Sequence, residues 1–184
     1  IFYSNDFKEQ AMVQYNKAVA TYGEGGVALS LTGTKEEFKN DFAKMDGKTV
    51  AVMIMTHGKN QSLTLNNSGT EQITATGTGK TNISKSDALN VQDLPKPKAD
   101  ISGAVLYMFS CHSADTNPNA HGEGDHSQGP LSGSGKPIAR VFSETFNFQS
   151  VRGTAGSVNY HSFFTDGTSS LSSHYMEPYA EDGT

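Results

Sequence analysis

The sequence contains a single cysteine and no tryptophan, and only fourteen of its 184 residues are lysine or arginine. A single thiol excludes a disulfide within the chain and a metal site built from several thiolates. The cations are scattered and the net charge is −5, so we expect no nucleic-acid partner. No apolar run approaches the roughly eighteen residues that span a bilayer, and we therefore predict no membrane span.

The hydrophobic content of 35% in 184 residues suffices for one core, so residues 1–184 are predicted to form a single domain. The chain begins at Ile1 without an initiator methionine or a signal-like segment, and we expect a domain excised from a longer protein. Frequent Gly, Ser, Thr and Asn are typical of secreted or cell-surface bacterial proteins, and we predict that location. The oligomeric state stays open.

Short apolar runs alternate with helical patterns in the first third of the chain. Strands are predicted at 1–4, 27–31 and 49–58. One helix is predicted to end at Tyr22, and a second to begin at a capping box formed by Thr34 and Glu37. The order β-α-β-α-β predicts an α/β fold with a mostly parallel sheet and right-handed crossovers.

The later segments are less regular. Polar alternation at 62–65 and 72–74 predicts a small exposed hairpin. A short helix is predicted within 82–94, and a second helix over 137–146. Residues 114–136 are rich in Gly, Asn, Pro and Ser and predict a long flexible loop. A further strand is expected at 151–160, followed from Thr165 by a tail of loop or edge structure.

Two buried strands end in reactive side chains, the strand at 49–58 in His57 and the strand at 103–111 in Cys111. Because the carboxyl ends of parallel strands meet at one edge of a sheet, we expect these two residues to emerge together. A thiol beside an imidazole is a standard nucleophile at neutral pH. Either residue alone indicates an ordinary structural position, but the pair on matching strands favours a cysteine peptidase.

This arrangement resembles that of the caspase-like, clan CD, cysteine peptidases, which include caspases, legumains, clostripains, gingipains and the autoprocessing domains of bacterial toxins. The likeness covers roughly residues 1–165, and the 54 residues from His57 to Cys111 are comparable with the spacing in caspases. The resemblance implies a three-layer α/β/α sandwich and an endopeptidase that needs no cofactor and acts on a protein or peptide. Whether the enzyme also processes its own chain stays open. Ser110 and His112 depart from the caspase signature Q-A-C-[RQG]-G, so the Asp specificity of true caspases is not expected.

The same resemblance assigns roles to individual residues. Cys111 is implied to be the nucleophile and His57 the general base and acid of a Cys-His dyad. The backbone N–H groups of Gly58 and Cys111 are implied to form the oxyanion hole, because glycine lets the backbone approach the acyl carbon. The resemblance names no third catalytic residue.

The segment after the next helix is implied to build the substrate pocket, and its polar candidates are Arg152, Asn159 and Asp166. By charge complementarity, Arg152 would favour an acidic substrate side chain and Asp166 a basic one.

Other functions stay open at this point. A caspase-like fold without activity would serve as a binding or assembly module of a larger bacterial surface or toxin protein. Residues 121–126 carry imidazoles and carboxylates suited to zinc or calcium, but intervening glycines favour a solvated loop, so no metal site is predicted. Residues 74–81 lack the leading glycine of a phosphate loop, and no G-x-S-x-G elbow is present.

Overall fold

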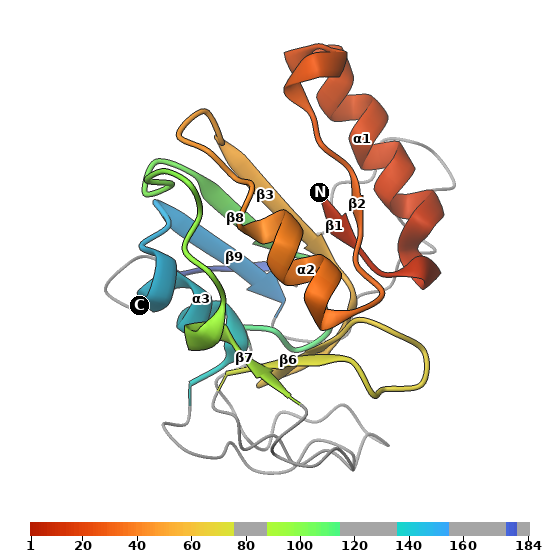
Figure 1. Cartoon of the computed structure of the whole chain (residues 1–184), viewed down its shortest axis with the longest axis vertical. Helices are drawn as coiled ribbons and strands as arrows, with labels where there is room; N and C mark the ends of the chain where they lie inside the picture. Colours follow the sequence, from red (N-terminus) through yellow and green to blue (C-terminus); the bar gives the residue numbers. More distant parts are fainter. Residues whose placement is uncertain (76–87, 115–135, 155–175, 180–184) are drawn as a thin grey trace.

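A computed structural model of the chain describes residues 1–75, 88–114, 136–154 and 176–179. Within these ranges the main sheet has six strands in the order β10-β9-β8-β3-β1-β2 (Figure 1). Their bounds are Phe2–Tyr3 for β1, Ser30–Leu31 for β2, Ala51–Met55 for β3, Val105–Met108 for β8, Ser150–Thr154 for β9 and Met176–Tyr179 for β10. Five strands are parallel and β10 is antiparallel to β9, which confirms the predicted α/β class and mostly parallel sheet.

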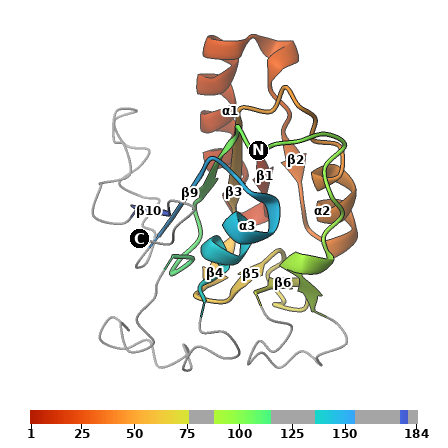
Figure 2. The same cartoon turned by 90° about the vertical axis from the view of Figure 1, so that its left-hand side faces the viewer.

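Helices cover both faces of this sheet (Figure 2). The helices are α1 at Lys8–Tyr22, α2 at Lys35–Phe42 and α3 at Ile138–Phe146, with 3-10 turns η1 at Asn5–Phe7, η2 at Glu24–Gly26 and η3 at Val91–Asp93. None of these helices is long and apolar enough to cross a membrane.

Alternate residues of the central strands separate into two apolar clusters. Val52 and Ile54 of β3 belong to the cluster that contains the phenylalanines of α2 and α3. Met53 and Met55 lie against the cluster at the start of α1. This alternation is what a strand with both faces covered requires. It places α1 on one face of the sheet and the other two helices on the opposite face.

Local signals set the ends of the helices as predicted. The Thr34 hydroxyl accepts a hydrogen bond from the Glu37 N–H, and the Glu37 carboxylate accepts one from the Thr34 N–H, which completes the capping box. Helix α1 ends at Gly23, whose φ of 77° lies in the region that favours glycine. Helix α3 begins directly after Pro137, as Pro at a helix start predicts.

A second sheet lies below the main one and joins β4 at His57–Lys59, β5 at Ser62–Thr64, β6 at Gln72–Thr74 and β7 at Leu89–Asn90, in that order (Figure 1). The predicted hairpin is therefore present as β5 and β6, but its predicted exposure is wrong. Leu63 and Ile73 are fully buried in the larger apolar cluster, because the second sheet closes the end of the core.

Other boundaries also differ from the predictions. The predicted strand at 49–58 divides at Thr56, where the chain leaves the main sheet and enters the second one. The helix predicted within 82–94 is wrong for residues 88–94, which form β7 and η3 because Leu89 pairs with Ile73 of β6. Residues 82–87 and the predicted strand beyond residue 154 lie outside the described residues.

Most of the loop predicted at 114–136 also lies outside the described residues, but its two ends are held in place. The Ala114 N–H donates to the Thr154 carbonyl at 3.0 Å, and the Gln61 side-chain amide donates to the Lys136 carbonyl at 3.2 Å. Lys136 also donates to Glu144 at 2.6 Å, and this hydrogen bond holds the pKa of the Glu144 carboxyl below its usual range. Both ends of the segment are thus fixed against the folded domain.

Candidate active site

The pairing of β3 with β8 brings His57 and Cys111 to the same edge of the main sheet. Ile54 is the register partner of Met108, and the Phe109 N–H donates to the Ile54 carbonyl at 2.8 Å. Strand β3 ends at Met55 and β8 at Met108, and beyond these ends Oγ1 of Thr56 lies 3.0 Å from Oγ of Ser110. Thr56 and Ser110 directly precede His57 and Cys111, so the structure places the two predicted residues just beyond the ends of neighbouring strands.

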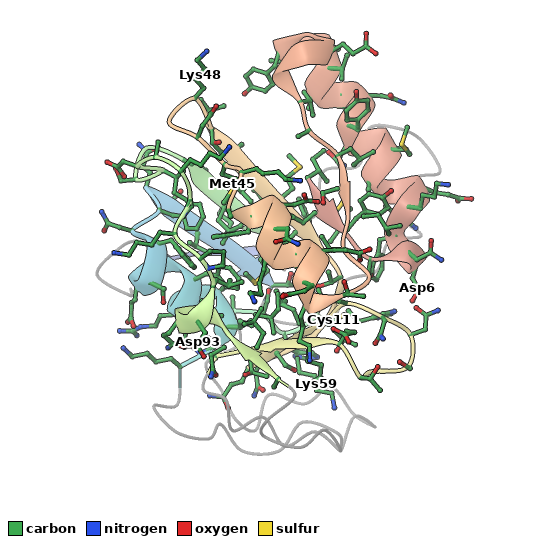
Figure 3. The ribbon with its side chains drawn as sticks, viewed as in Figure 1. Asp6, Met45, Lys48, Lys59, Asp93 and Cys111 are labelled. Atoms are coloured by element: carbon green, nitrogen blue, oxygen red, sulfur yellow. The ribbon has the colours of Figure 1, made fainter. Side chains whose placement is uncertain are left out.

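His57 lies on the α1 side of the sheet and reaches solvent. Its ring packs edge-on against Phe7, with ring centroids 4.9 Å apart, and its side chain is 56% exposed. The side chain of Cys111 is partly exposed. Figure 3 shows Cys111 at this edge of the sheet. The imidazole and the thiol are therefore accessible groups, unlike the buried residues that precede them.

Asp6 is a site residue that the sequence analysis did not identify. Its Oδ2 atom lies 3.1 Å from Nε2 of His57. Strand β1 pairs with β3 through Tyr3 and Met55, so the turn η1 that follows β1 carries Asp6 to the end of β3 (Figure 3). A carboxylate at this position orients the imidazole. Asp6 lies three residues beyond the end of the first strand, a position that by itself does not identify His57 as its neighbour.

The pair of Asp6 and His57 occupies the point where the order of the strands reverses. From β1 the chain goes to β2 on one side, and the next strand, β3, returns to the other side of β1. Open α/β sheets bind their ligands outside the carboxyl ends of the strands at such a switch point. The candidate site therefore lies where this class of fold most often carries one.

Gly58 is required by a close approach of two backbone segments. A Cβ atom built on Gly58 would lie 2.7 Å from Cβ of Ser110 and 3.0 Å from the Cys111 carbonyl oxygen. No side chain fits there unless one of the two segments moves. The predicted oxyanion-hole residues, Gly58 and Cys111, thus lie on two closely approaching segments.

Cys111 lies at the corner of a tight turn. The Ser113 N–H donates to the Ser110 carbonyl at 3.3 Å, which closes the turn around Cys111 and His112. His112 is 5% exposed and has a φ of 55°, in the left-handed region that costs a non-glycine residue on the order of 1 kcal/mol. The turn stores this strain directly beside the thiol.

Strand β9 holds the far side of the turn. The Ser113 hydroxyl accepts a hydrogen bond from the Thr154 N–H at 3.1 Å, and the Ser113 carbonyl accepts one from the Ala139 N–H at 2.9 Å. A Cβ atom on Gly153 would lie 2.7 Å from Cβ of Ala114, so glycine is needed for this approach as well. The turn that carries Cys111 is therefore fixed by β9 and by the start of α3.

Of the three predicted pocket residues, only Arg152 lies within the described part of the chain; Asn159 and Asp166 lie outside it. Arg152 is paired in register with Tyr107, and its guanidinium lies 5.9 Å from the centre of the Tyr107 ring. Tyr107 precedes Cys111 by four residues, which corresponds to about 13 Å along an extended strand. Arg152 is thus on the His57 side of the sheet but not beside the thiol.

Within the described ranges, no group of three or more His, Cys, Asp or Glu residues could hold a metal ion. The 121–126 segment considered for zinc or calcium lies outside those ranges.

Comparisons with protein-family models, with curated proteins and with solved structures find no match to this chain. The assignment of a function therefore depends on the chemistry of the site.

Proposed function

We propose that this chain is a cysteine peptidase of caspase-like, three-layer α/β/α fold that cleaves proteins or peptides and requires no cofactor. One observation supports the proposal above the others: His57 and Cys111 follow the neighbouring strands β3 and β8 at the same edge of the sheet, and the Asp6 carboxylate lies on His57. An inert structural thiol is usually buried, whereas Cys111 is partly exposed.

In the proposed reaction, the Nδ1 atom of His57 takes the proton of the Cys111 thiol while Asp6 holds Nε2. The thiolate attacks the scissile carbonyl carbon, and the N–H groups of Gly58 and Cys111 stabilise the oxyanion. Collapse of this intermediate breaks the C–N bond, and the leaving amine takes the proton from His57. Water, deprotonated by His57, then hydrolyses the thioester, which releases the acid and restores the thiol.

The proposal is tested by intact-mass spectrometry after brief exposure, near neutral pH, to peptidyl acyloxymethyl ketones that differ in the residue next to the warhead. We expect one adduct on the wild-type protein and none on the Cys111→Ala variant. A preference for an acidic residue would support Arg152 as a pocket residue, and a preference for a basic one would support Asp166. A native thiol that stays unlabelled, both before and after cleavage of the 114–136 segment, would instead indicate an inactive binding or assembly module.

The Asp6→Asn variant is expected to label about tenfold more slowly than the wild type. The substitution keeps the shape of the side chain but removes the negative charge beside the His57 ring. The effect is limited because solvent screens the pair: the side chains are 30% and 56% exposed. Labelling rates measured by mass spectrometry check this prediction.

Asp46→Asn is the matched control, since Asp46 accepts a hydrogen bond from the Lys48 N–H in the turn before β3, at the opposite end of that strand. Equal rates for the Asp6 and Asp46 variants would contradict a role for Asp6.

A further inference from the structure

Four buried hydroxyl side chains form a row across the main sheet, just below the candidate site. Extending the strand pairing sets Thr32 after β2, Ser4 after β1, Thr56 after β3 and Ser110 after β8 at the same level. Each of the four is at most 1% exposed. Polar side chains buried this deeply are costly unless they are hydrogen-bonded, so their positions call for a specific explanation.

Two members of the row are bonded to each other. Oγ1 of Thr56 lies 3.0 Å from Oγ of Ser110, and Thr56 and Ser110 directly precede His57 and Cys111. We propose that Thr56 and Ser110 are positioning residues, whose hydroxyl hydrogen bond sets the separation of the His57 imidazole and the Cys111 thiol. This inference rests on the proposed peptidase function.

The bond lies where the two chain segments part. At Thr56 the chain leaves β3 for β4 of the second sheet, and at Ser110 it leaves β8 for the turn that carries Cys111. Backbone pairing holds the two segments together up to Phe109 and Ile54. Beyond this last backbone hydrogen bond, the hydrogen bond between the Thr56 and Ser110 hydroxyls links the two segments.

Ser110 is also confined from its other side. Its Cβ atom lies 2.7 Å from the position that a Cβ atom would take on Gly58. The side chain is therefore held between the Thr56 hydroxyl and the β4 backbone. Proton transfer requires heavy atoms about 2.6–3.2 Å apart, so a shift of a few tenths of an ångström at this level matters to the reaction.

The test compares Thr56→Val, which keeps the shape and removes the hydroxyl, with Thr56→Ser, which keeps the hydroxyl. Thr32→Val is the matched control, because Thr32 is equally buried in the same row but bonds to the Tyr3 carbonyl at 3.2 Å, away from His57 and Cys111. The rate of labelling by the peptidyl ketone is measured for each folded variant across neutral pH, together with its thermal unfolding.

We expect Thr56→Val to label on the order of tenfold more slowly than the wild type, with a changed pH profile. Thr56→Ser and Thr32→Val should keep the wild-type rate and profile. A wild-type profile for Thr56→Val would overturn the positioning role, and so would an equal slowing in Thr32→Val, since that would indicate a general effect of losing a buried hydroxyl.

If Thr56→Val does not fold, the double variant Thr56→Val, Ser110→Ala takes its place, since removing both hydroxyls leaves neither one buried without its partner. It should fold and still label slowly; a wild-type rate in the folded double variant would overturn the inference. A wild-type protein whose labelling does not depend on His57 would overturn the proposed function itself. If labelling of the wild type depends on His57 but Thr56→Val labels as fast as the wild type, the positioning role alone is overturned.

Discussion

Replacing His57 by alanine is expected to slow the labelling of Cys111 by a peptidyl acyloxymethyl ketone by about 10²- to 10⁴-fold, the usual contribution of a general acid or base. An unassisted thiol is mostly protonated at neutral pH, and the substitution removes the group that we propose accepts its proton. Intact-mass spectrometry at timed intervals gives the rate for each variant.

Two control measurements test whether the slower labelling comes from the loss of the imidazole and not from unfolding or from a damaged thiol. The His57 side chain is more than half exposed, so the variant should unfold close to the wild-type temperature. After unfolding, its thiol should react with iodoacetamide at the wild-type rate. Labelling of native His57→Ala at the wild-type rate would contradict the dyad.

The Gly58→Ala variant is expected to lose both stability and reactivity. The new Cβ atom would lie 2.7 Å from Cβ of Ser110 and 3.0 Å from the carbonyl oxygen of Cys111, and neither neighbour is the free end of a flexible side chain. Overpacking of this kind costs about 1–3 kcal/mol in the free energy of unfolding. Relieving the contact moves either β4, which carries His57, or the turn that carries Cys111, so labelling should slow on the order of tenfold or more.

Gly103→Ala is the control, because a Cβ atom on Gly103 would have no neighbour within 4 Å. Urea unfolding and ketone labelling are measured for both variants. Gly103→Ala should behave like the wild type in both measurements. If the Gly58→Ala protein were as stable to urea and labelled as fast as the Gly103→Ala protein, the close contact described for Gly58 would be refuted.

The helices could be predicted because their signals are local. The Thr34 capping box, Gly23 and Pro137 each act within one turn of helix, and each marks a helix end in the structure. The burial of the hairpin could not be predicted in this way. Ser62 and Gln72 are buried as well as their apolar neighbours, and the Gln72 side-chain nitrogen donates a hydrogen bond to the Gly69 carbonyl at 3.0 Å. A polar residue that has a hydrogen-bond partner inside the protein can be buried, but its sequence pattern predicts that it is exposed.

Part of the candidate site could likewise be predicted from the sequence, and part could not. That His57 and Cys111 share one edge follows from parallel strands alone, and the structure places them there. The contact between Asp6 and His57 depends on the order of the strands. Asp6 reaches His57 only because β1 lies beside β3 in the sheet. Strand order results from the packing of the whole domain, and no local pattern around Asp6 encodes it.

The division of the chain at Thr56 means that the two candidate catalytic residues are carried by different sheets. His57 begins β4 of the second sheet, whereas Cys111 follows β8 of the main sheet. The distance between imidazole and thiol therefore measures how the two sheets are placed relative to each other. We therefore expect that a substitution or a binding event that displaces β5, β6 or β7 changes that distance, and with it the reactivity of Cys111, while the backbone of β3 and β8 stays in place.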